Sequence, residues 1–264
     1  MNAISLTPED LAVAALLILV DGALSLVLRL DLHRQILVAA LRLVVQLLLI
    51  GYVLRVVFAL GSPAVTLLIV VLMTLVAARE VAARSDRKFA GRGNFTIASI
   101  AVTAATGITV LLALATAIRP HPWWNPHYAI PLAGIVLGSV LNAASLSLDA
   151  MLDGVVRERA AIEAQLALGA TYQEAIRPLI RNAARKGLIP IINQMSAAGI
   201  ITLPGIMTGQ ILAGMDPMEA VKYQVLLMFL LAGGSGLASV GMAFLAAGRL
   251  TDGRQRLRLD RLKA

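Results

Sequence analysis

The sequence predicts an all-α polytopic membrane protein, and three observations support this class. Hydrophobic residues make up 59% of the 264-residue chain, charged residues only 14%, and the mean hydropathy is +0.83. Too few polar residues remain to cover the surface of a soluble domain. Several apolar runs approach the roughly 20 residues that a helix needs to cross a bilayer core of about 30 Å. Helices satisfy their own backbone hydrogen bonds in lipid, so these runs predict a helical bundle.

Seven apolar segments are candidate membrane spans, and together they predict a single permease domain over residues 1–264. The segments are Leu11–Leu28, Ile36–Leu54, Ala64–Ala78, Phe95–Ile118, Ile130–Leu152, Leu188–Leu212 and Ala220–Leu245. Thr7 and Pro8 fit the N-cap and first position of the first helix. The third segment is short, and we expect its helix to begin before Ala64.

The fifth, sixth and seventh segments contain polar residues, proline or glycine clusters. In the fifth, Asn142 and Asp149 belong to one small and polar stripe. The sixth contains Asn193 and Gln194 and is interrupted at Pro204-Gly205, where proline removes a backbone donor. The glycine cluster at residues 233–236 lies inside the seventh run rather than after a strand, so it is not a P-loop.

Ionisable groups within spans usually pair with each other or line a water-filled path. Asp21 and Arg42 fall at matching depths in neighbouring spans, which predicts either an ion pair between the helices or a contact with cargo. Asp149 is the third such charge. The candidates for a translocation path are Arg42, Gln46, Asn142, Asn193, Gln194, Pro204, Met207, Thr208 and Gln210.

Basic residues predict the orientation, because Lys and Arg accumulate in cytoplasmic loops. Most of the 23 Lys and Arg residues lie in alternate loops and in a basic tail over residues 249–264. The N-terminus is therefore expected outside, and the C-terminus inside, a bacterial inner membrane. The basic residues are dispersed and no aromatic-basic groove accompanies them, so nucleic acid is not an expected partner.

A charged helix-corner-helix over residues 157–187 interrupts the apolar segments, and we call it the elbow. The sequence predicts a short amphipathic helix, a left-handed residue at Gly169, and a capping box from Thr171 to Glu174 that starts the next helix. The simplest interpretation of the elbow is an interfacial connector. Arg177, Arg181 and Arg185 form a basic stripe that would meet lipid phosphates or an acidic protein surface.

The elbow also resembles the coupling loop of ABC-transporter permeases. The matching residues are Glu163, Ala164, Leu168, Gly169, Ala170 and Thr171. Gln165 replaces a small residue of that motif. The string from Leu203 to Pro217, together with Arg42, Gln46 and residues 51–54, is similar to FetB-like permeases, a family of bacterial iron-export ABC subunits and plant aluminium-tolerance permeases.

This resemblance implies a seven-span permease that forms a homodimer, works with a separate cytoplasmic ABC ATPase, and exports iron or another metal. ATP and magnesium would then bind to the ATPase, because this chain contains no P-loop and no hydrolase motif. The chain itself is expected to be a transport subunit without a cofactor, and its metal ligands are unknown. The alternatives are an ABC permease for a nucleotide sugar or other organic solute, and an ATP-independent transporter.

Overall fold

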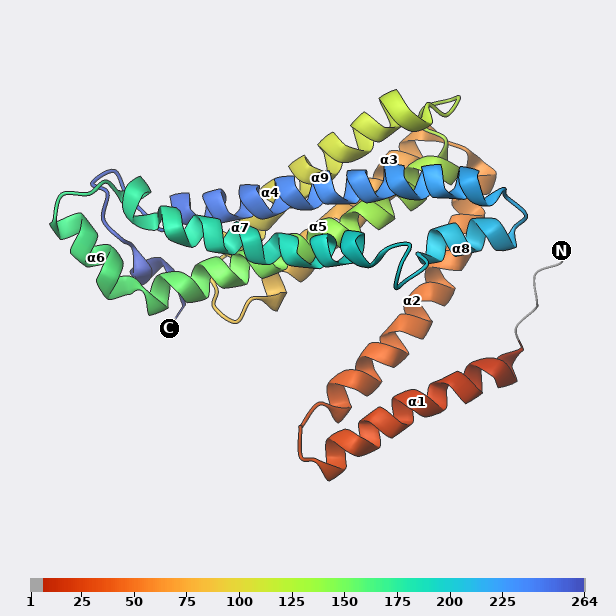
Figure 1. Cartoon of the computed structure of the whole chain (residues 1–264), viewed down its shortest axis with the longest axis horizontal. Coiled ribbons are helices and arrows are strands. Elements are labelled where there is room, and N and C mark those ends of the chain that lie inside the picture. Colours follow the sequence, from red (N-terminus) through yellow and green to blue (C-terminus); the bar gives the residue numbers. More distant parts are fainter. Residues whose placement is uncertain (1–6, 264) are drawn as a thin grey trace. The chain divides into compact units, whose positions relative to one another are not determined.

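A computed structural model describes residues 7–263 and confirms the all-α class (Figure 1). Its helices within that range are α1 (Pro8–Val27), α2 (His33–Leu60), α3 (Pro63–Arg84), α4 (Gly93–Leu112), α5 (Pro126–Arg157), α6 (Arg159–Ala167), α7 (Tyr172–Ala197), α8 (Gly205–Leu212) and α9 (Pro217–Arg249). A π-helical turn, Ala113–Ile118, extends α4, and a 3₁₀ turn, Leu259–Arg261, lies in the C-terminal tail.

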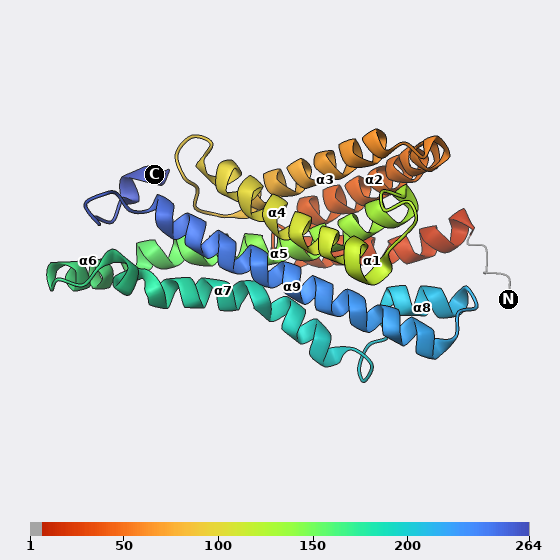
Figure 2. The same ribbon diagram turned by 90° about the horizontal axis from the view of Figure 1, so that it is seen from above.

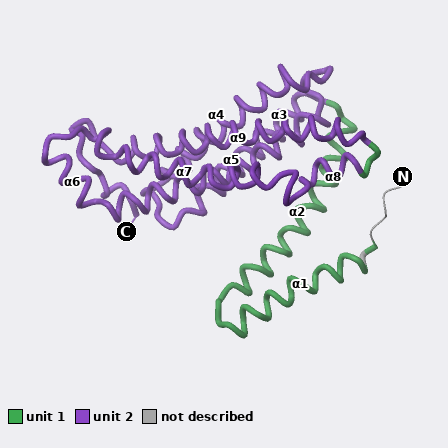
Figure 3. The backbone as a smooth tube through the Cα atoms, viewed as in Figure 1, with its two compact units in different colours: residues 1–61, 212–214 green, residues 62–211, 215–264 purple. Residues whose placement is uncertain are grey.

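The chain divides into two compact units, which Figure 3 colours separately. One unit consists of residues 1–61 and 212–214, and the other of residues 62–211 and 215–264. The prediction of one permease domain is not tested by this division and stays a prediction.

The first unit is a helical hairpin of α1 and α2. Thr7 caps α1 as predicted, since its side chain accepts from the Asp10 amide while the Asp10 carboxylate accepts from the Thr7 amide. Most side chains of both helices are exposed, as expected of helices whose solvent is lipid. Asp21 and Arg42 are among the exposed residues, and the role predicted for them stays a prediction.

The second unit is built around α5, which packs against α3, α4, α7 and α9. Long apolar side chains of α5, including Leu148, Met151 and Leu152, are completely buried. Small residues on α9 allow close approach, since Ala238, Ala243 and Ala246 have no exposed surface. Helix α5 is therefore the central helix of this unit, and the polar groups described below are arranged around it.

The structure corrects the count of continuous spans. Six helices of residues 7–263 are long and apolar enough to cross a bilayer, namely α1, α2, α3, α4 with its π-helical turn, α5 and α9. The sixth predicted segment, Leu188–Leu212, is not one helix, because α7 ends at Ala197 and α8 begins only at Gly205. Gly199, at φ +83°, turns the chain immediately after α7.

Two helices therefore replace the sixth predicted span. The apolar part of α7 from Gly187 to Ala197 is about 16 Å long and α8 about 12 Å long at 1.5 Å per residue. In Figures 1 and 2, α8 continues in the direction of α7, and α9 then returns. Pro204 precedes α8, and its carbonyl accepts from the Thr208 amide at 3.0 Å. The expected proline break inside a helix is thus a loop from Ala198 to Pro204.

Candidate functional site

A small polar pocket lies where α5, α7 and α9 meet. Its volume is about 290 Å³. Two of the path candidates, Asn142 of α5 and Gln194 of α7, both line it. The hydroxyls of Ser139 and Ser235 also line the pocket and lie 2.7 Å apart, joining α5 to α9. The fold thus brings together polar groups from three helices that are distant in the sequence.

Two glycines of the pocket wall differ in the space around them. A Cβ added at Gly138 would meet no atom within 4 Å, so this glycine faces open space. A Cβ added at Gly187 would lie 2.6 Å from the carbonyl oxygen of Ala143 and would also collide with Ser239. Gly187 therefore permits the contact of α7 with α5 and α9, whereas Gly138 contributes to the width of the pocket.

Hydroxyl groups hold the three helices together on the side of the pocket toward the elbow. The Ser147 hydroxyl donates to the Ser239 carbonyl at 2.8 Å, and the Ser239 hydroxyl donates to the Ala184 carbonyl at 2.9 Å. Both serines are completely buried, so their hydrogen bonds avoid the desolvation cost of a buried unpaired hydroxyl. This pair of bonds fixes the positions of α7 and α9 against α5.

Arg84 is a charged neighbour of the pocket that the sequence did not indicate. It ends α3, and its Nη1 donates to the Asn142 side-chain oxygen at 3.1 Å. In the sequence Arg84 is one of several basic residues in a predicted cytoplasmic loop, so nothing distinguished it from the others. Only the packing of α3 on α5 brings its guanidinium to Asn142, which lines the polar pocket.

The other path candidates do not line this pocket. Asn193 lies beside Gln194 on α7 and is exposed. Met207, Thr208 and Gln210 are half-buried on α8, and the side-chain oxygen of Gln210 is buried without a hydrogen-bond partner among the described residues. The remaining candidates are the half-buried Pro204, in the loop before α8, and Arg42 and Gln46 in the other compact unit.

Asp149, the third predicted intramembrane charge, holds the loop between α3 and α4. One oxygen of its carboxylate accepts from the Ser85 hydroxyl at 3.3 Å and from the Asp86 amide at 3.2 Å. Arg87 of the same loop lies 3.6 Å from Asp153, one turn further along α5. These contacts give Asp149 a structural role at the end of α3.

The elbow has the geometry that the sequence predicted. Gly169 adopts φ +93° after α6, and the hydroxyl of Thr171 accepts from the Glu174 amide at 3.3 Å. The Glu174 carboxylate in turn accepts from the Thr171 hydroxyl and amide, and these hydrogen bonds keep the pKa of Glu174 below its ordinary value. The corner between α6 and α7 is therefore fixed by local hydrogen bonds.

The two faces of α6 differ in burial. Ile162 is only 2% exposed and anchors the helix to the core, and Leu166 packs beside it. Glu163 and Ala164 are exposed, and Glu163 pairs with Arg159 at 2.8 Å. At the corner, Leu168 is 88% exposed and is followed by the exposed Gly169 and the half-buried Ala170. The elbow thus presents the exposed apolar side chain of Leu168, which we call its apolar tip, at the end of α6.

The C-terminal tail folds back onto the loop before α4. The carbonyl of Arg261 accepts from the Ala90 amide at 2.7 Å, and its guanidinium donates to the Arg249 carbonyl at 2.7 Å. Hydrogen bonds from Arg256 lower the pKa of the Asp252 carboxyl. Because the folded pKa is lowered, this carboxylate stabilises the tail at neutral pH, and its contribution is lost as the pH falls through that folded pKa.

Tyr172, the first residue of α7, connects the elbow to the end of α9. Its buried hydroxyl donates to the Ala247 carbonyl at 2.8 Å, and its amide donates to the Gln255 side chain at 3.0 Å. Burial raises the pKa of Tyr172, so the phenol stays protonated and remains a donor. The sequence did not indicate this contact, because it joins residues 75 positions apart.

A Tyr172→Phe substitution is expected to lower the free energy of unfolding by about 1 kcal/mol, because the hydrogen bond that joins α7 to the end of α9 is lost and the Ala247 carbonyl keeps only the Leu250 amide as donor. Thermal unfolding in detergent measures this change. Tyr128→Phe, which removes a hydroxyl from a half-exposed ring on α5, is the matched control. Equal midpoints for the two variants would contradict a structural role for the Tyr172 hydroxyl.

The site offers neutral oxygens rather than a cluster of strong metal ligands. Within residues 7–263, no group of three or more His, Cys, Asp or Glu side chains is arranged to hold a metal ion. The pocket provides hydroxyl and amide groups from Ser139, Asn142, Gln194 and Ser235. Such oxygens suit hard cations, and they also suit the polar groups of an organic solute.

Comparison with known proteins confirms the resemblance that the motifs indicated. Residues 8–250 match the model of the "Uncharacterised protein family (UPF0014)". The "Probable iron export permease protein FetB" of Escherichia coli is 33% identical over 264 residues, which cover 100% of this chain and 99% of that protein. The "UPF0014 membrane protein slr1647" of Synechocystis is 41% identical over 76% of this chain and 77% of its own length.

A plant relative is similar as well. The "UPF0014 membrane protein STAR2" of rice is 34% identical over 84% of this chain and 76% of its own length. No solved structure matches the chain.

Proposed function

The chain belongs to the UPF0014 family of membrane proteins, and on that premise we propose that it is the permease subunit of an ABC transporter. The proposed transporter exports iron or another metal across a bacterial inner membrane. A separate cytoplasmic ATPase would bind ATP and magnesium and drive the cycle. The observation that supports the proposal best is the elbow, whose short helix α6 ends at the exposed apolar side chain of Leu168.

The exposed tip fits a docking role. Leu168 contributes an apolar side chain that is 88% exposed at a predicted cytoplasmic corner. Covering such a side chain with a protein groove removes apolar surface from water, which is favourable. The neighbouring Gly169 and Ala170 are small and allow a partner surface to approach closely. A groove on an ATPase subunit is the proposed partner of this tip.

The elbow is also connected directly to the polar pocket. Glu158 is both the C-cap of α5 and the N-cap of α6, so these helices meet without a flexible linker. At the other end, the capping box at Thr171 starts α7. Since α5 and α7 both line the pocket, a displacement of the elbow by the ATPase would change the pocket directly. Nucleotide binding would shift the balance between pocket conformations in this way.

We further propose that two copies of the chain enclose the path. Asn142, Asn193 and Gln194 are exposed polar side chains at membrane depth. Lipid cannot satisfy their hydrogen bonds, so a water-filled path or a second protein surface is expected to cover them. A homodimer that closes around the pocket provides both.

The cargo proposal follows the relatives, one of which is named a probable iron export permease. A second candidate is an ABC permease for an anionic organic solute such as a nucleotide sugar. The observation that favours it is the guanidinium of Arg84, which lies 3.1 Å from Asn142 at the pocket. A positive charge there attracts phosphate or carboxylate groups and repels a bare metal cation.

Reconstitution with the ATPase tests these proposals together. The chain is expected to co-purify with a P-loop ATPase and to stimulate its hydrolysis of ATP in liposomes when iron is supplied. A panel of other metals and a nucleotide sugar separates the two cargo candidates. An ATPase whose P-loop lysine is replaced by alanine is the control. Transport that continues with this control would contradict ATP-driven export and favour an ATP-independent transporter.

A further inference from the structure

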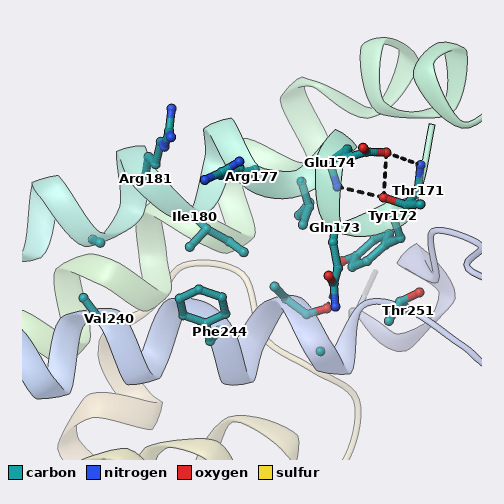
Figure 4. Close-up of a pocket in the computed structure, with 14 residues that line it drawn as sticks. Thr171, Tyr172, Gln173, Glu174, Arg177, Ile180, Arg181, Val240, Phe244 and Thr251 are labelled. Carbon is teal, nitrogen blue, oxygen red and sulfur yellow. Dashed lines mark hydrogen bonds between the residues drawn. The ribbon is translucent and has the colours of Figure 1, made fainter.

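A second and larger cavity lies between the first half of α7 and the last part of α9. We call it the groove; it has a volume of about 780 Å³, and Figure 4 shows the side chains that line it. The α9 side of the groove is apolar and consists of Val240, Phe244, Ala247 and Gly248. Phe244 is 60% exposed there, although α9 packs closely against other helices on its opposite side. The groove therefore leaves apolar surface uncovered within this unit.

The α7 side of the groove is basic. Arg177 and Arg181 lie one helical turn apart on α7 and are both exposed, while Ile180 between them faces α9 (Figure 4). The acidic residue of the groove lining is Glu174, whose carboxylate is engaged by the hydroxyl and amide of Thr171. Figure 4 shows Arg181 pointing away from α9, so the two exposed guanidinium groups border the groove on its α7 side, next to the apolar surface formed by Ile180 and α9.

The groove lies at the expected depth of the cytoplasmic lipid headgroups. Its lining reaches Gly248 and Thr251, on either side of Arg249, where α9 ends. On α7 it extends from Thr171 to Ala184 and stops before the apolar part that begins at Gly187. Acyl chains and phosphates of the cytoplasmic leaflet meet at this level, given the predicted orientation.

We propose that this groove is a binding site for an anionic phospholipid. The acyl chain would lie on the α9 surface around Phe244, and the phosphate would lie between Arg177 and Arg181. The charge of the groove selects an anionic headgroup. An acidic surface of a soluble ATPase would pair with the arginines but leave the apolar surface without a matching partner.

The lipid would contact the elbow itself, because the α7 side of the groove belongs to it. Tyr172 and Gln173 line the same groove, and Tyr172 forms the hydrogen bond that ties α7 to the end of α9. The composition of the cytoplasmic leaflet would therefore influence the attachment of the elbow. The binding site itself does not depend on the proposed transport function.

Native mass spectrometry of the full chain tests this proposal. The chain is purified from membranes of phosphatidylcholine that also contain phosphatidylglycerol, and the retained lipids are counted. The double variant Arg177→Gln/Arg181→Gln is expected to retain phosphatidylglycerol about tenfold less than the parent chain. The matched control Arg185→Gln/Lys186→Gln loses the same charge from the same helix, but outside the groove, and is expected to retain it like the parent.

A second variant tests the apolar surface. A Cβ added at Gly248 would meet no atom within 4 Å, so Gly248→Leu fills the groove without a backbone clash and is expected to displace the lipid. Equal retention of phosphatidylglycerol by the two double variants would overturn the proposal. So would a parent chain that retains phosphatidylcholine as well as it retains phosphatidylglycerol. Competition by inorganic phosphate alone would show an anion site rather than a lipid site. Loss of ATPase binding by the Arg177/Arg181 variant with unchanged lipid retention would assign the groove to the ATPase.

Discussion

A Gly187→Val chain is expected to unfold roughly 5–10 °C below the parent chain, which corresponds to the cost of overpacking a tight helix contact. The added Cβ would lie 2.6 Å from the carbonyl oxygen of Ala143 on α5 and would also collide with Ser239 on α9. Because both neighbours are held by buried contacts, α7 would have to move away. That movement would break the hydrogen bond from Ser239 to the Ala184 carbonyl.

The midpoint of unfolding in detergent can be followed by the fluorescence of the two tryptophans. Gly138→Val is the matched control, because Gly138 lines the same pocket but has no atom within 4 Å of the added Cβ. We expect Gly138→Val to keep the midpoint of the parent chain and to narrow the pocket. Equal losses of stability in the two variants would show that the contact of α7 with α5 is not the tight one.

A Leu168→Asp chain is expected to bind its ATPase about tenfold or more weakly while folding normally. The leucine is 88% exposed, so the substitution removes little packing within the chain. At an interface, a buried apolar anchor is often worth about 2 kcal/mol or more, and a charge in its place must also be desolvated. Titration of the detergent-solubilised chain with ATPase measures the affinity, and stimulated ATP hydrolysis measures the coupling.

Leu168→Met is the control for this variant, since it keeps an apolar side chain of similar volume. We expect it to retain both the affinity and the stimulated hydrolysis. If Leu168→Asp behaved like Leu168→Met, the tip of the elbow would have no role in coupling. A loss of unfolding midpoint in Leu168→Asp would instead indicate an unexpected structural role for this side chain.

Local signals in the sequence predicted the geometry of the elbow and the starts of two helices, after Thr7 and after Thr171. Gly169 and the Thr171–Glu174 pair act through hydrogen bonds and backbone conformations within a few residues, so their positions depend little on the rest of the fold. The N-cap at Thr7 is confirmed for the same reason. Composition and the long apolar runs together predicted the all-α membrane class, because lipid leaves few other ways to satisfy the hydrogen bonds of the backbone.

The broken sixth segment shows where prediction from hydropathy fails. Hydropathy treated Leu188–Leu212 as one span, and Pro204 was expected to interrupt it. Helix α7 ends earlier than Pro204, at Ala197, and Gly199 after it takes a positive φ. The helix also begins well before the apolar run, because its polar first half starts at Tyr172. Averaging over apolar residues cannot detect such a break, because Ile200, Ile201 and Leu203 of the loop are themselves apolar.

The candidate site was only partly predictable. Asn142 and Gln194 were expected on polar faces and do line one pocket. Arg84 and the contact of Tyr172 with Gln255 and Ala247 depend on tertiary packing between residues far apart in the chain. Periodicity describes one helix at a time, so it could not place these groups beside their partners.

The central claim is that the elbow faces the cytoplasm and receives force there. The chain contains no cysteine, so Leu168→Cys introduces a unique thiol at an exposed position. A membrane-impermeant maleimide should label this thiol in inside-out vesicles but not in right-side-out vesicles, and bound ATPase should protect it. Labelling from the periplasmic side, or labelling that the ATPase does not reduce, would contradict the account.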